Sequence, residues 1–389
     1  MPSITPGSTK LYLCADAGGT ALKVAVLTEK GEYGFATGPP CNVKSVGSQV
    51  AIRNILQTTW KALQNLETPL LLPVNKVDPE PLHLELFERV WLGIAGILRQ
   101  EEVDEFRPLA TEAFGFEADD ERLRITNDGH LLAAPAVSQK DIESTVVLVA
   151  GTGSVSLGEV DLFQQLARHA EASSNVAAFK KNDTDLELVG ISGGWGFLIG
   201  DEGSAFHVGR LAMRQLMLAA DAQPVLSSST SYPLLPIFAS LLSRLKVSTP
   251  AEMIDKIYSD HSNPSSPSSF SEAETQRKLW IADSSRVVFQ YAFDDPSDDQ
   301  ESRRIALSIL EEAVGPLVEA TLRLIGDRST IQSETGSLSL GGGLWNSEGY
   351  KDMLLEKLRA KGVEFAQVAI VKSAAEEGVK ALLALDQHQ

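Results

Sequence analysis

Short apolar runs separated by glycine turns dominate the beginning of the chain. Two of them, at 11–15 and 21–28, are joined by a tight glycine turn, and a third candidate run occupies 32–38. Runs of this length, bounded by turn residues, are typical of β-strands. Apolar runs at 89–96 and 122–126 predict two further strands.

One amphipathic helix is predicted between the third and fourth of these strands. Its apolar positions recur at helical spacing, as on the buried face of an amphipathic helix; they are Ile52, Ile55, Leu56, Thr59 and Leu63. Strands that alternate with helices are typical of an α/β fold.

A similar pattern begins again near residue 145. Residues 145–160 read as strand, Gly-Thr turn and strand, and 186–190 would be the third strand of the second copy. A helix is predicted from about Ser204, with an apolar stripe at Val208, Leu211, Ala212, Leu216 and Ala219. Later strands are predicted at 337–343 and 363–371. Two copies of one α/β unit predict two lobes that face each other across a cleft.

Length and composition agree with two globular domains. The chain has 389 residues, which is long for one hydrophobic core. Hydrophobic residues make up 43% and the mean hydropathy is −0.03, as in ordinary soluble proteins. Two segments show no clear periodicity, 164–185 and the Ser/Pro-rich 259–274. The second predicts a surface loop or local disorder.

Charge and cysteine content exclude several classes of protein. The net charge of −18 argues against nucleic-acid binding, although it does not exclude a small phosphorylated ligand. No run approaches the roughly 20 apolar residues of a membrane span, and the N-terminus lacks the apolar core of a signal peptide. We therefore expect a cytoplasmic protein. Cys14 and Cys41 are the two cysteines, too few for a disulfide framework, and Cys14 is expected to be buried.

The turn at 16–20 carries the first candidate chemistry. Asp16 ends a strand, and the amides of Gly18, Gly19 and Thr20, with the Thr20 hydroxyl, could hold phosphate oxygens. Asp16 could reach a metal ion, directly or through water. The alternative is a plain β-hairpin whose glycines supply positive φ.

A second turn of the same kind follows the strand at 145. Thr152, Gly153 and Ser154 are its potential phosphate donors. Either turn alone could be only a tight turn, but two at equivalent places in a duplicated unit could grip a polyphosphate from both lobes. Neither matches the Walker phosphate loop or the dinucleotide-binding fingerprint.

Asp128 lies just beyond a predicted strand, at the expected start of a helix that holds 131–136. A helix N-terminus favours an ionised carboxylate. Such a carboxylate can accept a proton from an alcohol as that alcohol attacks phosphorus. The alternative is that Asp128 only caps the helix.

The stretch at 190–204 contains six glycines. Gly193, Gly194 and Gly196 surround Trp195, whose flat ring is suited to packing on a sugar face. Asp201 follows, and it could instead complement the dipole of the helix from Ser204. A further run, Gly341, Gly342 and Gly343, ends a later strand, where a flat ring could lie on bare backbone or where the chain simply turns into a helix.

These pieces, in this order, resemble the sugar kinase/Hsp70/actin superfamily. Within it they most resemble the N-acetylglucosamine kinase group of the BadF/BadG/BcrA/BcrD-type ATPase family. DAGGTALKVAVL and VLVAGTGS are similar to the two phosphate motifs, GGWGFLIGDEGSAF to the signature loop, LSLGGGLW to the adenosine motif, and AAEEGVKALLAL to the closing helix. The matches cover roughly 11–135, 145–212 and 336–386.

The resemblance implies an α/β fold of two ribonuclease-H-like lobes around a central cleft. The N-terminal lobe would span 1–135, with the closing helix 373–386 packed back on it. The C-terminal lobe would span 136–372, with a loop insertion at about 259–274.

The resemblance also implies site residues. Thr20, Thr152 and Gly153 would contact the phosphates of ATP, and Gly342 and Gly343 would lie near its adenosine. The residues implied for the sugar are Asn42, Asp128, Gly194, Trp195, Gly196 and Asp201, with Asp128 as the catalytic base.

The implied activity is the ATP- and Mg²⁺-dependent phosphorylation of an amino sugar, N-acetyl-D-glucosamine to its 6-phosphate being the leading hypothesis. Ala95 stands where the family tends to carry a serine that faces the sugar, and His130 also departs from the pattern. The alternatives are a kinase for another sugar such as glucosamine, or a regulator that binds sugar and ATP without catalysis. An iron–sulfur ATPase activator is disfavoured by the places of Cys14 and Cys41. The sequence leaves a homodimer open.

Overall fold

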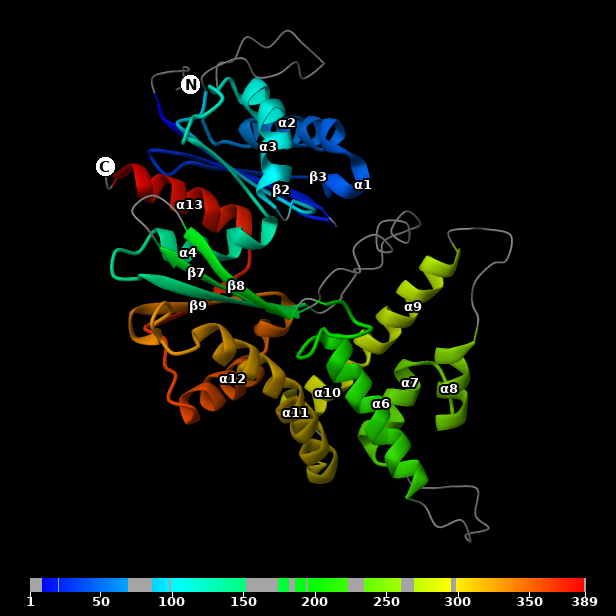
Figure 1. The fold of residues 1–389 in the computed structure, drawn as a ribbon. Helices are drawn as coiled ribbons and strands as arrows, with labels where there is room; N and C mark the ends of the chain where they lie inside the picture. The colour runs from blue at the N-terminus through cyan, green and yellow to red at the C-terminus, as the bar shows by residue number, and fades with distance from the viewer. Residues whose placement is uncertain are drawn as a thin grey trace. The chain divides into compact units, whose positions relative to one another are not determined.

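The computed structural model describes residues 9–19, 21–68, 86–97, 99–151, 174–181, 186–193, 195–222, 234–259, 269–294 and 299–387. The chain divides into two compact units (Figure 1). The first comprises Met1–Thr145, Lys180–Glu187 and Val371–Gln389, and the second comprises Val146–Phe179 and Leu188–Ile370. The lobe boundary predicted at residue 135 stays a prediction.

A five-stranded sheet forms the centre of the first unit, in the order β3-β2-β1-β4-β5. Its strands are β1 (Leu11–Ala17), β2 (Leu22–Thr28), β3 (Tyr33–Gly38), β4 (Arg89–Ile94) and β5 (Leu123–Thr126). β2 is antiparallel to β1 and β3, whereas β4 is parallel to β1 and β5. The strands β1, β3, β4 and β5 therefore all run in one direction, and their carboxyl ends lie at one edge of the sheet. All five strands were predicted from the sequence.

Helices cover both faces of this sheet because β1 is apolar on both. Leu11, Leu13 and Ala15 are buried in a cluster with side chains of α2 (Ser48–Gln64) and α3 (Gln100–Phe114). Cys14 points to the other face, where a Cβ on Gly378 of α13 (Ala374–Gln387) would lie 2.3 Å from its Sγ. Figure 1 shows α2 and α3 on one side and α13 on the other.

The prediction for the first helix is confirmed. The five apolar positions predicted for the first helix are all buried in α2. Cys14 is buried, as predicted, and the closing helix packs against β1 and β2. The remaining elements of the first unit are short: α1 (Val43–Val46), the 3-10 helix η1 (Asp128–Ala133) and α4 (Ala134–Val137).

A second five-stranded sheet has the order β10-β9-β6-β7-β8. Its strands are β6 (Ser144–Ala150), β7 (Ser174–Lys181), β8 (Leu186–Gly193), β9 (Gly336–Gly341) and β10 (Gln367–Val371). In both sheets the first strand is central, the second and third lie on one side of it, and the fourth and fifth lie on the other. The predicted duplication, and with it the predicted α/β fold class, is therefore confirmed.

One strand of the second sheet was missed by the sequence analysis. β7 lies in 164–185, where no element was predicted. The strand expected at the end of 145–160 lies outside the described residues. The predicted third, fourth and fifth strands correspond to β8, β9 and β10.

Helices make up the rest of the second unit. They are α6 (Ala205–Asp221), α7 (Pro236–Arg244), α8 (Pro250–Tyr258), α9 (Ser269–Asp283), α10 (Ser285–Phe289), the π-helix η2 (Gln290–Asp294), α11 (Gln300–Ile325), the 3-10 helices η3 (Ser333–Thr335) and η4 (Gly343–Asn346), and α12 (Glu348–Ala360). Ser204 caps α6 by accepting a hydrogen bond from His207 N, so this helix begins where it was predicted. α9 begins at Ser269, inside the segment for which a loop was predicted.

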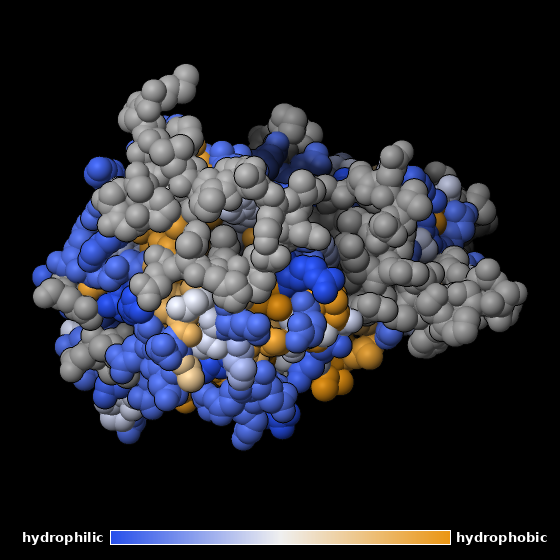
Figure 2. Space-filling view, turned by 90° about the horizontal axis from the view of Figure 1, so that it is seen from above, coloured by the Kyte–Doolittle hydropathy of each residue, from blue (hydrophilic) through white to orange (hydrophobic). Residues whose placement is uncertain are grey.

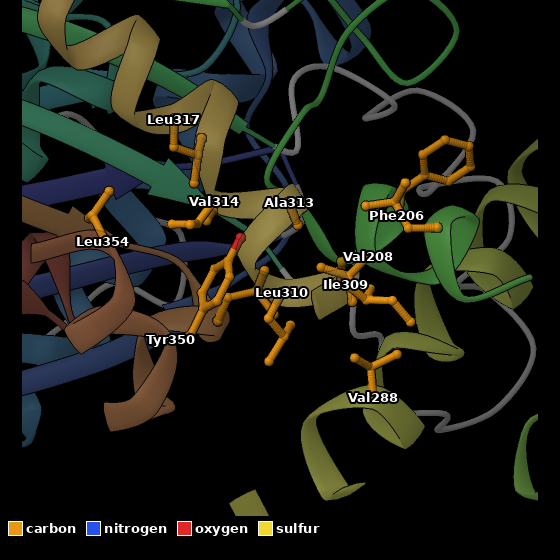
Figure 3. Packing of buried hydrophobic residues seen from close by; sticks show 14 of the residues in the cluster. Phe206, Val208, Val288, Ile309, Leu310, Ala313, Val314, Leu317, Tyr350 and Leu354 are labelled. Atoms are coloured by element: carbon orange, nitrogen blue, oxygen red, sulfur yellow. The ribbon is translucent and has the colours of Figure 1, made fainter. Parts of the chain in front are cut away.

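The core of the second unit is built around α11. Figure 3 shows Ala313, Val314 and Leu317 of α11 beside Tyr350 of α12, with Phe206 and Val208 of α6 further along the helix. Within the predicted α6 stripe, Val208, Leu211, Ala212 and Leu216 are buried and Ala219 is half-buried. The stripe therefore serves the core, as predicted.

The described surface seen in Figure 2 is mostly hydrophilic, with smaller apolar patches. Among the described residues, no helix combines the length and the hydrophobicity that a bilayer crossing requires.

Candidate functional site

The first phosphate turn follows the central strand of the first unit. Asp16 is the penultimate residue of β1, and its register partners are Lys23 on β2 and Gly93 on β4. Its Oδ2 lies 3.9 Å from Lys23 Nζ, and its Oδ1 would be 3.7 Å from a Cβ on Gly18, so the carboxylate lies beside the turn. Gly19 follows it at the turn, and Thr20 lies outside the described residues.

Burial shapes the chemistry of Asp16. Desolvation raises the pKa of this carboxyl above its ordinary value, and the charge of Lys23 opposes the shift. A second cation at the turn would stabilise the ionised form further.

Asn42 is held against the same turn by backbone hydrogen bonds. Cys41 N donates to Gly18 O at 3.1 Å, and Val43 N donates to Ala95 O at 3.0 Å. Asn42 itself is buried, and its Oδ1 accepts from Lys44 N at 2.9 Å, which caps α1. Oδ1 already accepts in the cap, which leaves Nδ2 as the group of Asn42 that could donate to a ligand.

Asp128 is the first residue of η1, directly after β5. The helix cap is Asn127, whose Oδ1 accepts from Gly129 N at 2.9 Å and whose Nδ2 donates to Ile97 O at 2.8 Å. The capping role that was the alternative for Asp128 therefore falls to its neighbour. Asp128 Oδ1 also lies 3.0 Å from Gly129 N, which holds the carboxylate in a fixed direction. The predicted helix here begins as a 3-10 turn and continues as α4.

Gly93 determines how closely Asp128 approaches the sheet, and the sequence analysis did not single it out. A Cβ on Gly93 would lie 2.4 Å from Leu131 Cδ1 and 3.2 Å from Asp128 Cα. Only a residue without a side chain lets η1 pack this closely over β4. The signal in the sequence is the glycine inside an otherwise apolar strand.

Asp16, Asn42 and Asp128 are thus brought to one edge of the first sheet. Each follows or ends a strand that runs in the same direction, namely β1, β3 and β5. In α/β sheets, ligands bind beyond the carboxyl ends of such strands. The catalytic and phosphate-binding roles of these residues stay predictions.

The second phosphate turn begins at the end of β6. Thr152, Gly153 and Ser154 lie outside the described residues, but Gly151 is described, and its carbonyl accepts from Ala205 N at 3.2 Å. The start of α6 is therefore fixed to the turn.

The predicted adenosine glycines lie beside this turn in the second unit. Gly342 follows β9 with a φ of 100°, and a Cβ there would be 2.4 Å from Ala150 O. Gly343 begins η4. The absence of side chains here allows β9 and β6 to end close together, so packing alone explains Gly342.

The signature loop contains the predicted sugar residues of the second unit. Trp195 is 64% exposed, so a ligand could reach its side chain. Gly196 adopts a φ of 78° and accepts a hydrogen bond from Gly200 N at 2.8 Å. Gly194 lies outside the described residues.

Asp201 is placed quite differently from the acids of the first unit. Its side chain is 0% exposed, its φ is 61°, and its Oδ2 lies 3.8 Å from Lys278 Nζ on α9. Burial lowers the pKa of Lys278, and the Asp201 carboxylate opposes that shift. Lys278 was missed because it lies in a region that carries no recognisable motif.

Packing fixes the end of the signature loop. Gly203 has a φ of 82°, and a Cβ there would lie 2.3 Å from Leu317 Cγ. Gly203 N donates to His207 Nδ1 at 3.0 Å, and Tyr350 Oη donates to Gly203 O at 3.1 Å. Here the glycine is required by the fold of the loop itself.

The cysteines carry no sign of redox or cluster chemistry. Both thiols are buried, and burial raises the pKa of Cys41 to about 11 and that of Cys14 well above its ordinary value. Among the described residues no group of three or more His, Cys, Asp or Glu side chains could hold a metal ion. A magnesium ion bound mainly by substrate phosphates needs only one or two carboxylates, and Asp16 meets that requirement.

Comparison with known proteins identifies relatives that match nearly the whole chain. The N-acetyl-D-glucosamine kinase of Dictyostelium discoideum is 23% identical over 351 residues, which cover 90% of each chain. No family model matches the chain.

Solved structures agree on the fold. A candidate N-acetylglucosamine kinase from Chromobacterium violaceum has a TM-score of 0.54 at 18% identity and covers 97% of this chain and 99% of its own. A candidate N-acetylglucosamine kinase from Porphyromonas gingivalis has a TM-score of 0.54 at 14% identity, with 97% and 100% covered. The resemblance found in the sequence is therefore confirmed: the chain is a distant homologue of an N-acetyl-D-glucosamine kinase and has the fold of solved candidate kinases of that group.

Proposed function

We propose that the protein transfers the terminal phosphoryl group of ATP to a hydroxyl of an amino sugar, with N-acetyl-D-glucosamine and its 6-phosphate as the leading pair. The observation that carries the proposal is the common edge of the first sheet. A carboxylate suited to proton abstraction, a glycine turn suited to phosphates and a buried amide all lie at that edge. The homology to an N-acetyl-D-glucosamine kinase supports the choice of sugar.

Asp128 acts as the general base in this proposal. Its carboxylate accepts the proton of the sugar hydroxyl as the hydroxyl oxygen attacks phosphorus and the bond to the leaving ADP oxygen breaks. The Gly129 amide bound to Oδ1 restrains the carboxylate, so less conformational freedom is lost when the sugar arrives.

The two glycine turns hold the triphosphate. Gly18, Gly19 and Thr20 offer donors in the first unit, and Thr152, Gly153 and Ser154 offer them in the second. Asp16 would hold Mg²⁺ directly or through water. When bound, Mg²⁺ neutralises charge that develops on the transferred phosphoryl group. Gly342 and Gly343 would lie near the adenosine.

The residues that the resemblance implies for the sugar come from both units. The Asn42 amide would donate to a sugar oxygen, the exposed ring of Trp195 would pack on the pyranose face, and Asp201 would accept from sugar hydroxyls. Gly194 and Gly196 would let the loop backbone approach the ring. The proposal requires both units to face the same pair of ligands, as the resemblance predicts.

Ala95 favours one variant of the proposal, a kinase for another amino sugar such as glucosamine. Ala95 contributes only its backbone here, since its N donates to Ala17 O and its O accepts from Val43 N, both at 3.0 Å. A serine hydroxyl at this position would give the sugar one more hydrogen bond. An alanine cannot make that bond, which relaxes selectivity for one substrate. A homodimer and a cytoplasmic location remain predictions from the sequence.

The decisive experiment measures ADP release, coupled to NADH oxidation, over a panel of amino sugars, with thermal unfolding of the same samples. The expected result is ADP release with N-acetyl-D-glucosamine or a close amino sugar, and a higher melting temperature with that sugar and an ATP analogue. Sugar-dependent stabilisation without ADP release with any sugar would favour the inactive regulator instead. The absence of both stabilisation and turnover with every sugar would refute the proposal.

A further inference from the structure

The helix α9 packs against α6 in the second unit more closely than side chains normally allow. A Cβ on Gly209 of α6 would lie 1.7 Å from Ile281 O of α9, so only glycine permits this contact. Lys278 lies three residues before Ile281, about one helical turn, on the same side of α9. The close crossing therefore fixes where the Lys278 side chain lies.

Lys278 reaches the signature loop and meets Asp201 there. Its side chain is 10% exposed, its Nζ lies 3.8 Å from Asp201 Oδ2, and the same Nζ lies 5.2 Å from the centre of the Phe197 ring. The ammonium group is thus in contact with two residues of one loop. Lys278 belongs to a part of the chain to which the proposed function assigns no task.

The pair is costly to bury, which calls for a reason. Removing two charges from water carries a large desolvation penalty, and hydrophobic replacements of similar volume are often equally stable or more stable. Asp201 also has a φ of 61°, in the left-handed region that is uncommon for residues other than glycine, although aspartate adopts it more often than most. Strain and buried charge that persist together are typical of functional sites.

Resting on the proposed function, we infer that Lys278 is a positioning residue of the sugar site, which holds the Asp201 carboxylate in the place and direction needed to accept sugar hydroxyls. A carboxylate offers about four lone-pair sites, so Asp201 can pair with Lys278 and accept from a hydroxyl at once. The Asp201 side chain is 0% exposed, so the sugar must displace the atoms that cover it. Lys278 acts through Asp201 and touches neither the reacting hydroxyl nor the phosphates.

The test compares Lys278→Met with Lys278→Arg in steady-state kinetics of the whole protein. Lys278→Met keeps the length of the side chain and removes its charge, and we expect KM for the sugar to rise about tenfold to 100-fold, because small displacements of a binding group have effects of this size. KM for ATP should stay unchanged, and kcat should fall far less than KM rises. Lys278→Arg restores the charge and should return KM for the sugar close to its original value.

Lys256→Met is the matched control. Lys256 lies on α8 of the same unit, and its Nζ lies 4.7 Å from the centre of the Trp280 ring on α9, so the variant also removes a cation from an aromatic contact. This variant should leave KM for the sugar unchanged. If Lys256→Met raises the sugar KM as much as Lys278→Met does, the rise comes from a general disturbance of helix packing, and the inference is wrong.

In Lys278→Met the buried Asp201 carboxylate loses its cation, which could impair folding. The double variant Lys278→Met/Asp201→Asn avoids this problem because it removes the carboxylate charge as well. If Lys278 acts through Asp201, the double variant has the same sugar KM as Asp201→Asn alone. An additional rise in KM, or an unchanged KM in Lys278→Met, overturns the inference while the proposed function stands. A wild-type protein that neither binds nor phosphorylates any amino sugar overturns both.

Discussion

The two units share a strand order but position their acidic residues in different ways. In the first unit, Asp16 and Asp128 lie where strands of the sheet end, Asp16 beside the turn at Gly18 and Asp128 beside the Gly129 amide. In the second unit, Asp201 lies in a loop, is closed off from solvent and faces Lys278. The first arrangement follows from the sheet alone, whereas the second needs a helix that is distant in the sequence.

The difference has its origin in what each unit inserts between its third and fourth strands. Between β3 and β4 of the first unit the described residues form only α1 and α2. Between β8 and β9 of the second unit lie the helices from α6 to α11, and α9 brings the cation to the signature loop. A duplicated α/β unit can thus gain a new charge at its site by a helical insertion, with its sheet order unchanged.

The largest expected effect tests the strand-end arrangement of the first unit. Asp128→Asn keeps the shape of the side chain and removes the base, so we expect kcat to fall about 100- to 10,000-fold, while sugar binding is retained. Asp120→Asn is the control, because Asp120 lies before β5, paired with Arg122 at 2.7 Å, whereas Asp128 follows that strand. Near-normal turnover in Asp128→Asn, or an equal loss in Asp120→Asn, would show that the base has been assigned to the wrong residue.

The next effect tests how far packing determines the loop of the second unit. Gly203→Ala places a methyl group 2.3 Å from Leu317 Cγ at a φ of 82°. We expect a loss of about 3 kcal/mol in the free energy of unfolding, measured with urea. Gly315→Ala on α11 is the control, because no atom outside its chain neighbours and its own helix backbone lies within 4 Å of the added Cβ. There we expect a smaller change, since the better helix propensity of alanine is opposed by the ring of Pro316, which crowds a preceding Cβ. Equal losses in both variants would contradict the packing argument.

The same loop should make the second unit sensitive to acid. Burial, with a smaller contribution from Arg210, lowers the pKa of His207 to about 4, while Nδ1 accepts from Gly203 N. His207 takes up a proton below pH about 6.5 in the unfolded chain, but only below pH about 4 in the folded chain. The contribution of His207 to the free energy of unfolding is therefore complete above pH about 6.5 and is lost as the pH falls toward about 4.

Between pH 7 and pH 5 we expect His207 to account for a loss of about 2 kcal/mol. His207→Asn, whose Oδ1 can accept the same hydrogen bond, should lose less stability over this interval. The measurement is urea unfolding of both proteins at the two pH values. Parallel losses in the two proteins would mean that other groups cause the acid sensitivity.

The comparison also shows which parts of the fold and site the sequence makes visible. Strands with apolar residues on both faces, such as β1, and helices with a regular apolar stripe, such as α2 and α6, leave a periodic signal that needs no tertiary information. The strand β7 was missed because its short run, NVAAFKK, lies among polar residues and is recognisable only by its place next to β6.

The same limit applies to the candidate site. Asp16 and Asp128 could be found because each lies at the end of a predicted strand. Lys278 could not, since a lysine on a helix normally belongs to a solvated face, and only the contact of Gly209 with Ile281 directs it inward. The glycines of the signature loop were expected to make room for a ligand. At Gly203 the structure shows a glycine required by the protein's own packing.

The smallest effect concerns the contact by which the first unit holds its closing helix, for which the second unit has no equivalent among the described residues. Tyr12 Oη donates to Asp386 Oδ2 at 2.8 Å, and Lys10 Nζ donates to the same oxygen at 2.6 Å. Tyr12→Phe should cost about 1 kcal/mol in unfolding free energy, because Lys10 still neutralises the carboxylate while the hydrogen bond is lost. Tyr33→Phe on β3 is the control, since that side chain is 37% exposed and should change nothing. If Tyr12→Phe is also neutral in thermal unfolding, the helix is held by its apolar face and by the Gly378–Cys14 contact, and its polar end contributes nothing measurable.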